Sequence, residues 1–159
     1  MRRSDREIKN FEDIIRVMEK CDVCRLAWND DEYPYILPLN FGMEVSDHKI
    51  TLYFHGALEG KKYELIQRDK RASFEMDCSH RLVTDLNGGN CTMEYESVIG
   101  RGMIEIVEEE EKYNALCTLM KHYHQEAFPF NKAVIPKTTV FKLTVESVTG
   151  KVRMKKDEK

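Results

Sequence analysis

The sequence predicts a mainly β protein whose strands form an antiparallel barrel or sandwich with a few α-helices attached. Six or so segments are rich in strand-forming residues, and short turn-like connections separate most of them, as in antiparallel hairpins. Only three segments repeat apolar residues at the three- and four-residue steps of a helix. Hairpin-connected strands with few helices are typical of barrels and sandwiches.

The first element is predicted to be a helix over residues 4–20. Ser4 and Glu7 have the spacing of a capping box, which marks a helix N-terminus. Apolar residues then recur at Ile8, Phe11, Ile14, Ile15 and Met18. This spacing places them on one face of the helix.

Three strands are expected next, over residues 23–28, 33–45 and 50–55. Polar turn residues separate them, at positions 29–32 and 46–48. The middle strand contains Pro34 and Pro38, and proline cannot donate a hydrogen bond to a β-ladder. That strand therefore requires an edge position or a bulge.

The second half of the chain mixes helices, strands and one long loop. We predict a helix at 58–68, a strand at 72–76, a loop at 80–90, a strand at 93–107, a helix at 109–123, an irregular stretch at 125–137 and a strand at 138–148. The loop contains a strong turn signal, Asn-Gly-Gly-Asn, at residues 87–90. Gly100 and Gly102 interrupt the long strand and predict a bend or bulge there.

Length and composition fit one cytoplasmic domain. The chain has 159 residues, of which 42% are apolar and 33% charged, so we expect a single domain over 1–152 and a disordered basic tail over 153–159. No apolar run predicts a membrane span or a signal peptide. The five cysteines are therefore expected to be reduced thiols. The net charge of -3 predicts no general attraction to nucleic acid or to acidic membranes.

Residues 55–62, His-Gly-Ala-Leu-Glu-Gly-Lys-Lys, link a predicted strand to a predicted helix. The first turn of a helix offers backbone N–H groups and a favourable dipole to a phosphate. Gly56 and Gly60 allow the backbone to approach a ligand closely, and Lys61 and Lys62 add positive charge. Taken alone, the segment also fits a surface turn with two solvated lysines, which is the commoner case.

The proline-interrupted segment 35–42, Tyr-Ile-Leu-Pro-Leu-Asn-Phe-Gly, is a second candidate. Proline leaves some backbone polar groups of a strand unpaired, and these can bond the edge of a flat aromatic ligand. The alternative is a bulged edge strand without a ligand.

Two other patterns are interpreted as structural. Cys21 and Cys24 form a C-x-x-C pair at a helix-to-strand junction, whereas a zinc ribbon needs a second pair and a thioredoxin-type site needs a strand-to-helix junction. His122 and His124 diverge at the end of a predicted helix. No metal site is expected, and motifs of hydrolases, kinases and Rossmann folds are absent.

Four motifs, in order along the chain, carry a resemblance to a known family. They are Val-Cys-Arg-Leu-Ala at 23–27, Pro-Tyr-Ile-Leu-Pro-Leu-Asn-Phe-Gly at 34–42, Leu-Tyr-Phe-His-Gly-Ala-Leu-Glu-Gly-Lys-Lys at 52–62 and Tyr-Glu-Ser-Val-Ile-Gly-Arg-Gly at 95–102. The chain resembles the pyridoxamine 5'-phosphate oxidase-related flavoproteins, and among them the 5-nitroimidazole antibiotic resistance branch. The resemblance implies a six-stranded antiparallel split β-barrel and a homodimer that binds FMN at its interface.

The resemblance also implies which residues hold the cofactor. The phosphate-binding segment of the family matches Gly56, Gly60, Lys61 and Lys62. The strand that contacts the flavin ring, with one residue of its neighbour, matches Pro38, Leu39, Asn40, Phe41 and Arg25. The partner strand matches Glu96, Ser97 and Val98. His55 matches the flavin-proximal histidine. As the catalytic residue it could donate a hydrogen bond or a proton to the substrate; the alternative is a satisfied barrel histidine that only anchors a loop.

The leading hypothesis is an FMN-dependent oxidoreductase of the nitroimidazole reductase type that acts on a small molecule. A protein that binds flavin, haem or the deazaflavin F420 without turnover of its own is the alternative. A third hypothesis is an interaction module that has lost its cofactor, against which the Gly60-Lys61-Lys62 cluster argues. Neither nucleic acid nor a membrane is expected as a partner.

Overall fold

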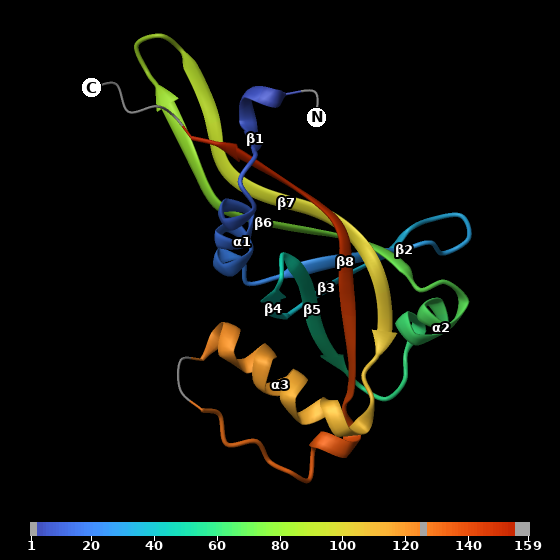
Figure 1. Cartoon of the computed structure of the whole chain (residues 1–159). Helices are drawn as coiled ribbons and strands as arrows, with labels where there is room; N and C mark the ends of the chain where they lie inside the picture. The colour runs from blue at the N-terminus through green and yellow to red at the C-terminus, as the bar shows by residue number, and fades with distance from the viewer. Residues whose placement is uncertain (1–2, 125–126, 155–159) are drawn as a thin grey trace.

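Antiparallel strands make up most of the computed structural model, which describes residues 3–124 and 127–154 (Figure 1). The strands of this part are β1 Glu7–Ile8, β2 Cys24–Trp28, β3 Tyr35–Leu39, β4 Gly42–Ser46, β5 Lys49–Gly56, β6 Arg71–Asp85, β7 Asn90–Ile106 and β8 Thr139–Arg153. Its α-helices are α1 Phe11–Lys20, α2 Lys61–Arg68 and α3 Glu109–Tyr123, and its short 3-10 helices are η1 Ser4–Arg6 and η2 Ile135–Lys137. The predicted mainly β class with a few flanking helices is confirmed.

One antiparallel sheet contains all of these strands. Its order is β3-β2-β6-β7-β8-β5-β4, and β1 pairs with β8 beside this path. β3 and β4 lie at the two ends of the order, although only residues 40–41 separate them in the chain. No ladder joins these two strands in the described residues, so the barrel is split between them.

The position of β3 explains the prolines of this region. β3 pairs only with β2, with Pro38 opposite Arg25, and an edge strand tolerates a residue that cannot donate to the ladder. The predicted edge position is confirmed. The prediction of a single strand over 33–45 is wrong. The strand is interrupted at residues 40–41, and the chain continues as β4 at the other end of the sheet.

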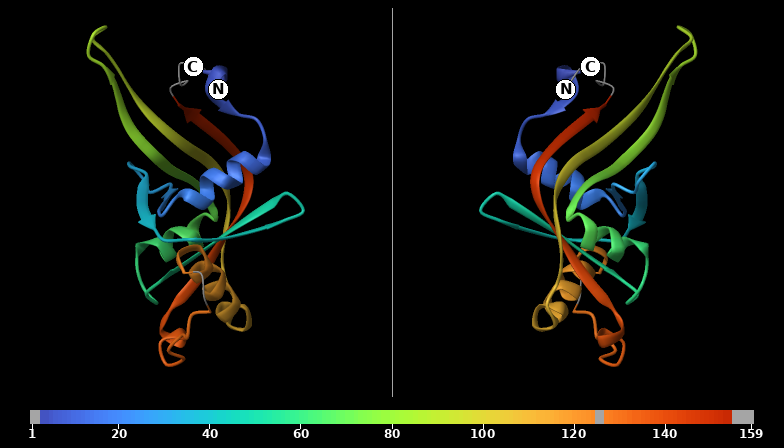
Figure 2. Two further views of the ribbon diagram at one scale, coloured as in Figure 1. Left: turned by 90° about the vertical axis from the view of Figure 1, so that its left-hand side faces the viewer. Right: turned by 90° about the vertical axis from the view of Figure 1, so that its right-hand side faces the viewer.

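The long β6–β7 hairpin corrects the loop predicted over 80–90. β6 continues to Asp85 and β7 starts at Asn90, so only residues 86–89, with Gly89 at φ 65, lie outside the strands. The hairpin projects from the body of the molecule as an arm (Figures 1 and 2). The predicted irregularity near the glycines of β7 is confirmed, since the β7–β8 register shifts between Arg101 and Gly102.

The two ends of the chain also differ from the predictions. The helix predicted from residue 4 begins at Phe11, because the side chain of Asn10 caps it by accepting a hydrogen bond from the Glu12 N–H at 3.1 Å. The residues before it instead pair with β8. At the C-terminus β8 extends to Arg153. The disordered tail was predicted to start at that residue, so its predicted start is corrected. Residues 155–159 of the predicted tail lie outside the described residues.

The core lies between the sheet and α1, with a second, smaller cluster under α3. Its largest fully buried side chains are aromatic, namely Phe41, Phe54, Phe74 and Phe141. The smaller cluster consists of Val107, Ala115, Leu116 and Val140. α3 packs mainly against β4 and β5 and less extensively against β8, and with α2 it frames the end of β5 at which the predicted site lies (Figure 1). Within the described residues, no helix has both the length and the apolar character to cross a membrane.

Candidate functional site

The segment after β5 forms an uncapped helix start. β5 ends at Gly56, and α2 begins at Lys61 with Gly60 as its N-cap residue. Gly60 has φ 140, a conformation that favours glycine. No side chain caps this end of α2, so its first backbone N–H groups are open to an anion.

The two lysines of this segment point to different neighbours. Lys61 forms an ion pair with Asp30 of the β2–β3 turn, and its Nζ lies 5.6 Å from the ring centroid of Tyr35. The Lys62 Nζ instead lies 4.3 Å from the ring centroid of Tyr63. Among residues 3–124 and 127–154, no carboxylate forms an ion pair with Lys62, and burial lowers the pKa of its amine.

The end of β5 holds Lys62 in place. A Cβ built on Gly56 would lie 2.8 Å from Lys62 Cε and 2.9 Å from the Tyr63 hydroxyl. That hydroxyl donates a hydrogen bond to the carbonyl oxygen of Ala57 at 2.6 Å. The close approach predicted for Gly56 is thus made by side chains of α2, and it directs the free amine toward the end of β5.

His55 lies on the outer face of β5, opposite Val140 of β8, while Phe54 points into the core. It is one wall of a 340 Å³ cavity between α3 and the segment that leads back to β8. Although the residue as a whole is exposed, burial of its imidazole lowers its pKa. The ring is therefore largely neutral at pH 7, with one nitrogen that donates and one that accepts.

The predicted ring-contacting strand divides into a surface part and a core part. Pro38 is exposed, Leu39 is half-buried, and the Asn40 side chain donates a hydrogen bond to the carbonyl oxygen of Asp22 at 3.2 Å. Phe41 is fully buried, its N–H donates to the Tyr123 hydroxyl at 2.9 Å, and its ring lies 4.3 Å from that of His122. Only the residues before Phe41 offer side-chain surface to a ligand.

Arg25 belongs to an exposed ionic cluster. Its guanidinium contacts Glu75 at 3.1 Å and Asp77 at 2.5 Å, and Asp77 also contacts the imidazole of His80 at 2.7 Å. Burial and the neighbouring Asp77 raise the pKa of Glu75, and the guanidinium of Arg25 partly offsets this rise. Arg25 is thus already charge-compensated within the chain.

The three predicted residues of β7 face in two directions. Glu96 is buried and binds the Lys20 ammonium at 2.9 Å and the Ser79 hydroxyl at 2.6 Å. Val98 is in the core, and Ser97 between them is half-buried on the other face. None of these contacts joins the β7 residues to Lys62 within one chain.

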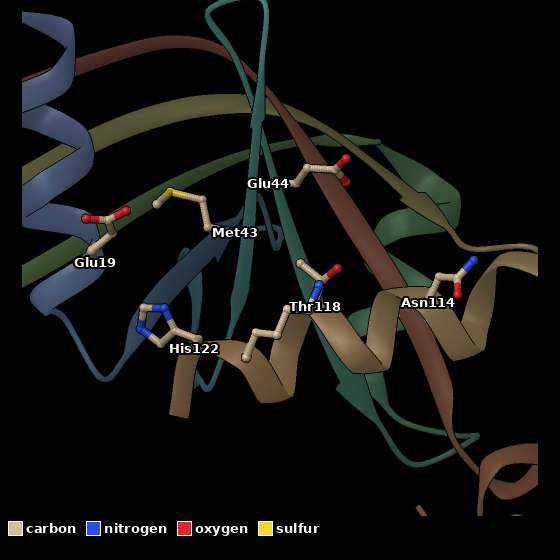
Figure 3. Close-up of a pocket in the computed structure, with 7 residues that line it drawn as sticks. Glu19, Met43, Glu44, Asn114, Thr118 and His122 are labelled. Atoms are coloured by element: carbon tan, nitrogen blue, oxygen red, sulfur yellow. The ribbon is translucent and has the colours of Figure 1, made fainter. Parts of the chain in front are cut away.

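Figure 3 shows a polar groove of 590 Å³ that includes none of the predicted site residues. Glu19 of α1, Met43 of β4 and His122 of α3 face it, and the imidazole Nε2 of His122 lies 2.7 Å from the carbonyl oxygen of Cys21. The groove mixes carboxylate, ammonium and amide groups. In the described part of the chain, no cluster of three or more acidic, histidine or cysteine side chains could hold a metal ion.

The cysteines do not form disulfides in this structure. Cys21 and Cys24 are buried, and burial raises the pKa of both thiols. A thiol with a raised pKa is a poor nucleophile at neutral pH, which agrees with the structural role predicted for the C-x-x-C pair.

Sequence reasoning missed two parts of the site. Asp30 forms an ion pair with Lys61, and the position of Asp30 in a predicted turn was the only sequence signal for that contact. The stretch predicted to be irregular over 125–137 supplies, from its described residues 127–137, aromatic and aliphatic side chains that wall the cavity beside His55. The concentration of Phe128, Pro129, Phe130, Val134 and Ile135 in a loop was the signal available.

Comparison with known proteins identifies the family. A family model described as pyridoxamine 5'-phosphate oxidase matches residues 11–152. A solved structure of a candidate 5-nitroimidazole antibiotic resistance protein from Bacteroides thetaiotaomicron is similar with 33% sequence identity and a TM-score of 0.80, covering 92% of this chain and 86% of that chain. No curated protein matches the chain.

More distant structures share the fold. A flavocytochrome from Azotobacter vinelandii has 18% identity and a TM-score of 0.80, covering 98% of this chain and 72% of that chain. An FAD-binding protein from Mesorhizobium loti has 23% identity and a TM-score of 0.66, covering 94% and 98%. Because the family model spans most of the sequence and a relative above 30% identity covers nearly all of it, the chain belongs to the pyridoxamine 5'-phosphate oxidase family.

Proposed function

We propose that this protein binds FMN and acts as an oxidoreductase on a small molecule. The observation that carries the proposal is Lys62, an amine without an ion-pair partner in the described residues, beside the uncapped start of α2. A phosphate dianion would replace the water around that amine with charge-assisted hydrogen bonds. Backbone N–H groups at the start of α2 add donors and a favourable dipole.

The residues present fit FMN in two respects. Lys62 and the start of α2 suit its phosphate, whereas Lys61, already paired with Asp30, would add mainly long-range positive charge. Pro38 and Leu39 offer surface and edge backbone to a flat ring system. Bound FMN would supply the electron-transfer chemistry.

His55 would act on the substrate rather than on the phosphate. Its neutral imidazole can donate a hydrogen bond from one nitrogen to a substrate oxygen or nitrogen, or transfer a proton to it. It opens onto the apolar cavity beside α3, which neither Gly56 nor Lys62 lines. We therefore propose His55 as the catalytic residue.

We further propose a homodimer in which two chains complete each FMN site. Exposed apolar side chains on the strands support an interface, among them Ile36 of β3 at 61% exposure and Ile99 of β7 at 58%. The unpaired edges of β3 and β4 also need covering. In such a dimer Ser97 and the β7 backbone would meet the partner's cofactor, since Glu96 and Val98 are buried in their own chain.

A second candidate is a protein that binds flavin, haem or a deazaflavin without turnover. The fold shared with a flavocytochrome and an FAD-binding protein favours this alternative. Family membership alone does not separate a carrier from an enzyme, because one fold supports many functions.

The deciding experiment is the absorption spectrum of the purified protein, followed by reduction. Oxidised flavin bands that bleach with NADH or NADPH, and return when a nitroaromatic acceptor is added, support the oxidoreductase. If the flavin is reduced and reoxidised at the same rate in His55→Gln as in the wild type, His55 has no catalytic role. A Soret band, or a flavin that no reductant bleaches, favours the carrier, and colourless protein that takes up no FMN contradicts both.

The dimer is tested by sedimentation velocity at micromolar concentration. A single species of twice the chain mass is expected, and a monomer that still binds FMN tightly would contradict the shared site.

A further inference from the structure

Two cysteines that are far apart in the sequence meet where α1 packs against β6. Cys21 directly follows the last turn of α1, and Cys78 belongs to β6, a strand that α1 contacts (Figure 1). Both thiols donate to one acceptor, the carbonyl oxygen of Val17, with Sγ–O distances of 3.2 Å for Cys21 and 3.9 Å for Cys78. The Cys78 thiol also lies within hydrogen-bonding reach of the Cys21 thiol. The two sulfurs are therefore neighbours in the folded protein.

The backbone at Cys21 leaves room for this pair to become covalent. Cys21 is the C-cap of α1, with an extended backbone at φ -83 and ψ 135, so it is outside the regular helix. A disulfide requires two sulfurs about 2.05 Å apart whose Cβ atoms face one another. Because the thiols already share an acceptor, rotation of the two side chains is the main movement needed.

The two thiols differ in their access to solvent. Cys21 is only 1% exposed, and Cys24, the other member of the C-x-x-C pair, is fully buried. Cys78 is half-buried. A small dissolved oxidant therefore meets Cys78 first, and Cys21 is the thiol held behind it.

Polar groups surround the sulfur of Cys78. The Ser79 hydroxyl donates to it at 3.6 Å, and the carboxylate of Glu96 lies 4.0 Å away as an acceptor for its S–H. The Lys20 ammonium, 2.9 Å from Glu96, is near enough for its charge to interact with the same sulfur. Cys78 thus has an acceptor for its proton and donors for the negative charge that develops on sulfur, as a reacting thiol requires.

We propose that Cys21 and Cys78 are an oxidation site, at which a hydroperoxide converts the two thiols into a disulfide that joins the end of α1 to β6. The proposal is independent of the proposed function, because it uses neither the cofactor nor a second chain.

The reaction with hydrogen peroxide has two steps. The Cys78 sulfur first attacks one peroxide oxygen, so that an S–O bond forms, the O–O bond breaks, and the leaving hydroxide takes the thiol proton and departs as water. The Cys21 sulfur then attacks the Cys78 sulfur, so that the S–S bond forms, the S–O bond breaks, and the second hydroxide leaves as water with the proton of Cys21. The two thiols together lose two electrons and two protons, and the peroxide is reduced to two waters.

The second step depends on contact between the sulfurs. Burial, and after it the Cys78 thiol, raises the pKa of Cys21, so this thiol gives up its proton reluctantly. Holding two reacting groups side by side offsets low intrinsic reactivity. The step should accordingly be faster at mildly alkaline pH than at neutral pH.

The test treats the reduced, full-length protein with hydrogen peroxide and digests it with trypsin without reduction. Cleavage after Lys20, Arg25, Arg71 and Arg81 should leave peptide 21–25 linked to peptide 72–81. Mass spectrometry should find this link in most molecules, with the intact chain lighter by two hydrogens, and a phosphine reductant should remove it.

Four variants identify the sulfurs. Because peptide 21–25 contains Cys24 as well as Cys21, Cys24→Ser should keep the link, and so should Cys91→Ser at an exposed position. Cys21→Ala and Cys78→Ala should abolish it. With Cys21→Ala the thiol of Cys78 should gain oxygen, whereas with Cys78→Ala the buried Cys21 should stay unmodified.

The disulfide should also raise the melting temperature by about 5–10 °C, because it closes a long loop in the unfolded chain. Cys78→Ala, at a half-buried position, should fold and should melt at the same temperature with and without the oxidant. Circular dichroism measures both.

Three results would overturn the proposal. They are a link between Cys21 and Cys24 in place of the one to Cys78, oxygen added to Cys78 of the wild type without any link, and a link that lowers the melting temperature. The last would show that the two sulfurs meet only when α1 leaves its place on β6.

Discussion

Lys62 lies directly against Gly56, since a Cβ built on Gly56 would come within 2.8 Å of Lys62 Cε and 3.0 Å of Lys62 Nζ. The missing side chain at position 56 is therefore what allows the amine to reach the end of β5. Lys61, one residue earlier, faces Asp30 instead. The two lysines consequently make different contributions to a bound anion.

Lys62→Met should weaken FMN binding about 10- to 100-fold, because one charge-assisted hydrogen bond contributes about 1.5–3 kcal/mol. Lys61→Met is the matched control and should weaken it less, since Asp30 already compensates the Lys61 charge. Quenching of flavin fluorescence on titration measures both affinities. Equal losses in the two variants would reject the assignment of the phosphate to Lys62.

Gly56→Ala should lower FMN affinity roughly 5-fold and also lower thermal stability. The added methyl group would displace the far end of the Lys62 side chain, which moves the amine away from its place beside the start of α2. It would also press on the Tyr63 hydroxyl, 2.9 Å away, which is held by its hydrogen bond to Ala57. The same substitution in a Lys62→Met background should have almost no further effect on affinity. A full additional loss in that background would show that Gly56 acts on the ligand by another route.

Glu96→Gln should destabilise the protein by about 1–3 kcal/mol at pH 7, because it weakens buried contacts to Lys20 and Ser79. Burial alone would raise the pKa of Glu96, but the Ser79 hydroxyl and the Lys20 ammonium outweigh it and lower the pKa from its ordinary 4.5. The stabilisation is therefore complete above pH 4.5 and is lost as the pH falls through the lowered pKa of the folded protein.

Thermal unfolding followed by circular dichroism at a series of pH values tests this. The difference between wild type and Glu96→Gln should shrink steadily below pH 4.5. Glu105→Gln, at an exposed site 4.0 Å from Lys70, should stay within about 0.5 kcal/mol of wild type throughout. A Glu96→Gln difference that is independent of pH would contradict the role given to its charge.

Gly102→Ala should destabilise the protein by more than ~2 kcal/mol, as expected for overpacking against rigid backbone. The added Cβ would lie 2.0 Å from the carbonyl oxygen of Thr144, at the register shift between β7 and β8. Glu105→Ala, at an exposed position of the same strand, should cost less than about 1 kcal/mol. Urea denaturation compares the two, and similar midpoints would mean that the bulge can relax to admit a side chain.

Much of the fold could be predicted because local signals agreed with the final packing. The apolar spacing of α3 gave its bounds, and the prolines gave the edge position of β3. The β6–β7 arm could not be predicted, because residues 80–85 show no apolar alternation, are largely exposed on both faces and become a strand only by pairing with β7. The start of α1 depends on β1 pairing with β8, a contact between the two ends of the chain.

The candidate site was predictable in composition but not in detail. The sequence placed Gly56, Lys61 and Lys62 together, yet it could not show that Asp30 of the β2–β3 turn forms an ion pair with Lys61. Likewise, the cavity beside His55 depends on how the segment after α3 folds back, and no periodic pattern encodes that path. Ion-pair choice and loop packing are decided by tertiary structure, not by local sequence.

The hydrogen bond from Phe41 N–H to the Tyr123 hydroxyl links the open seam of the barrel to the last turn of α3. The same helix supplies Leu116, Leu119 and Met120 to the wall of the cavity. A substrate that binds in the cavity beside His55 and immobilises α3 should therefore slow amide hydrogen exchange at Phe41, a residue that does not line the cavity. Hydrogen exchange at the Phe41 amide would thus report whether the cavity is occupied. Intrinsic tryptophan fluorescence is a poor probe for this purpose, because no tryptophan lines the cavity.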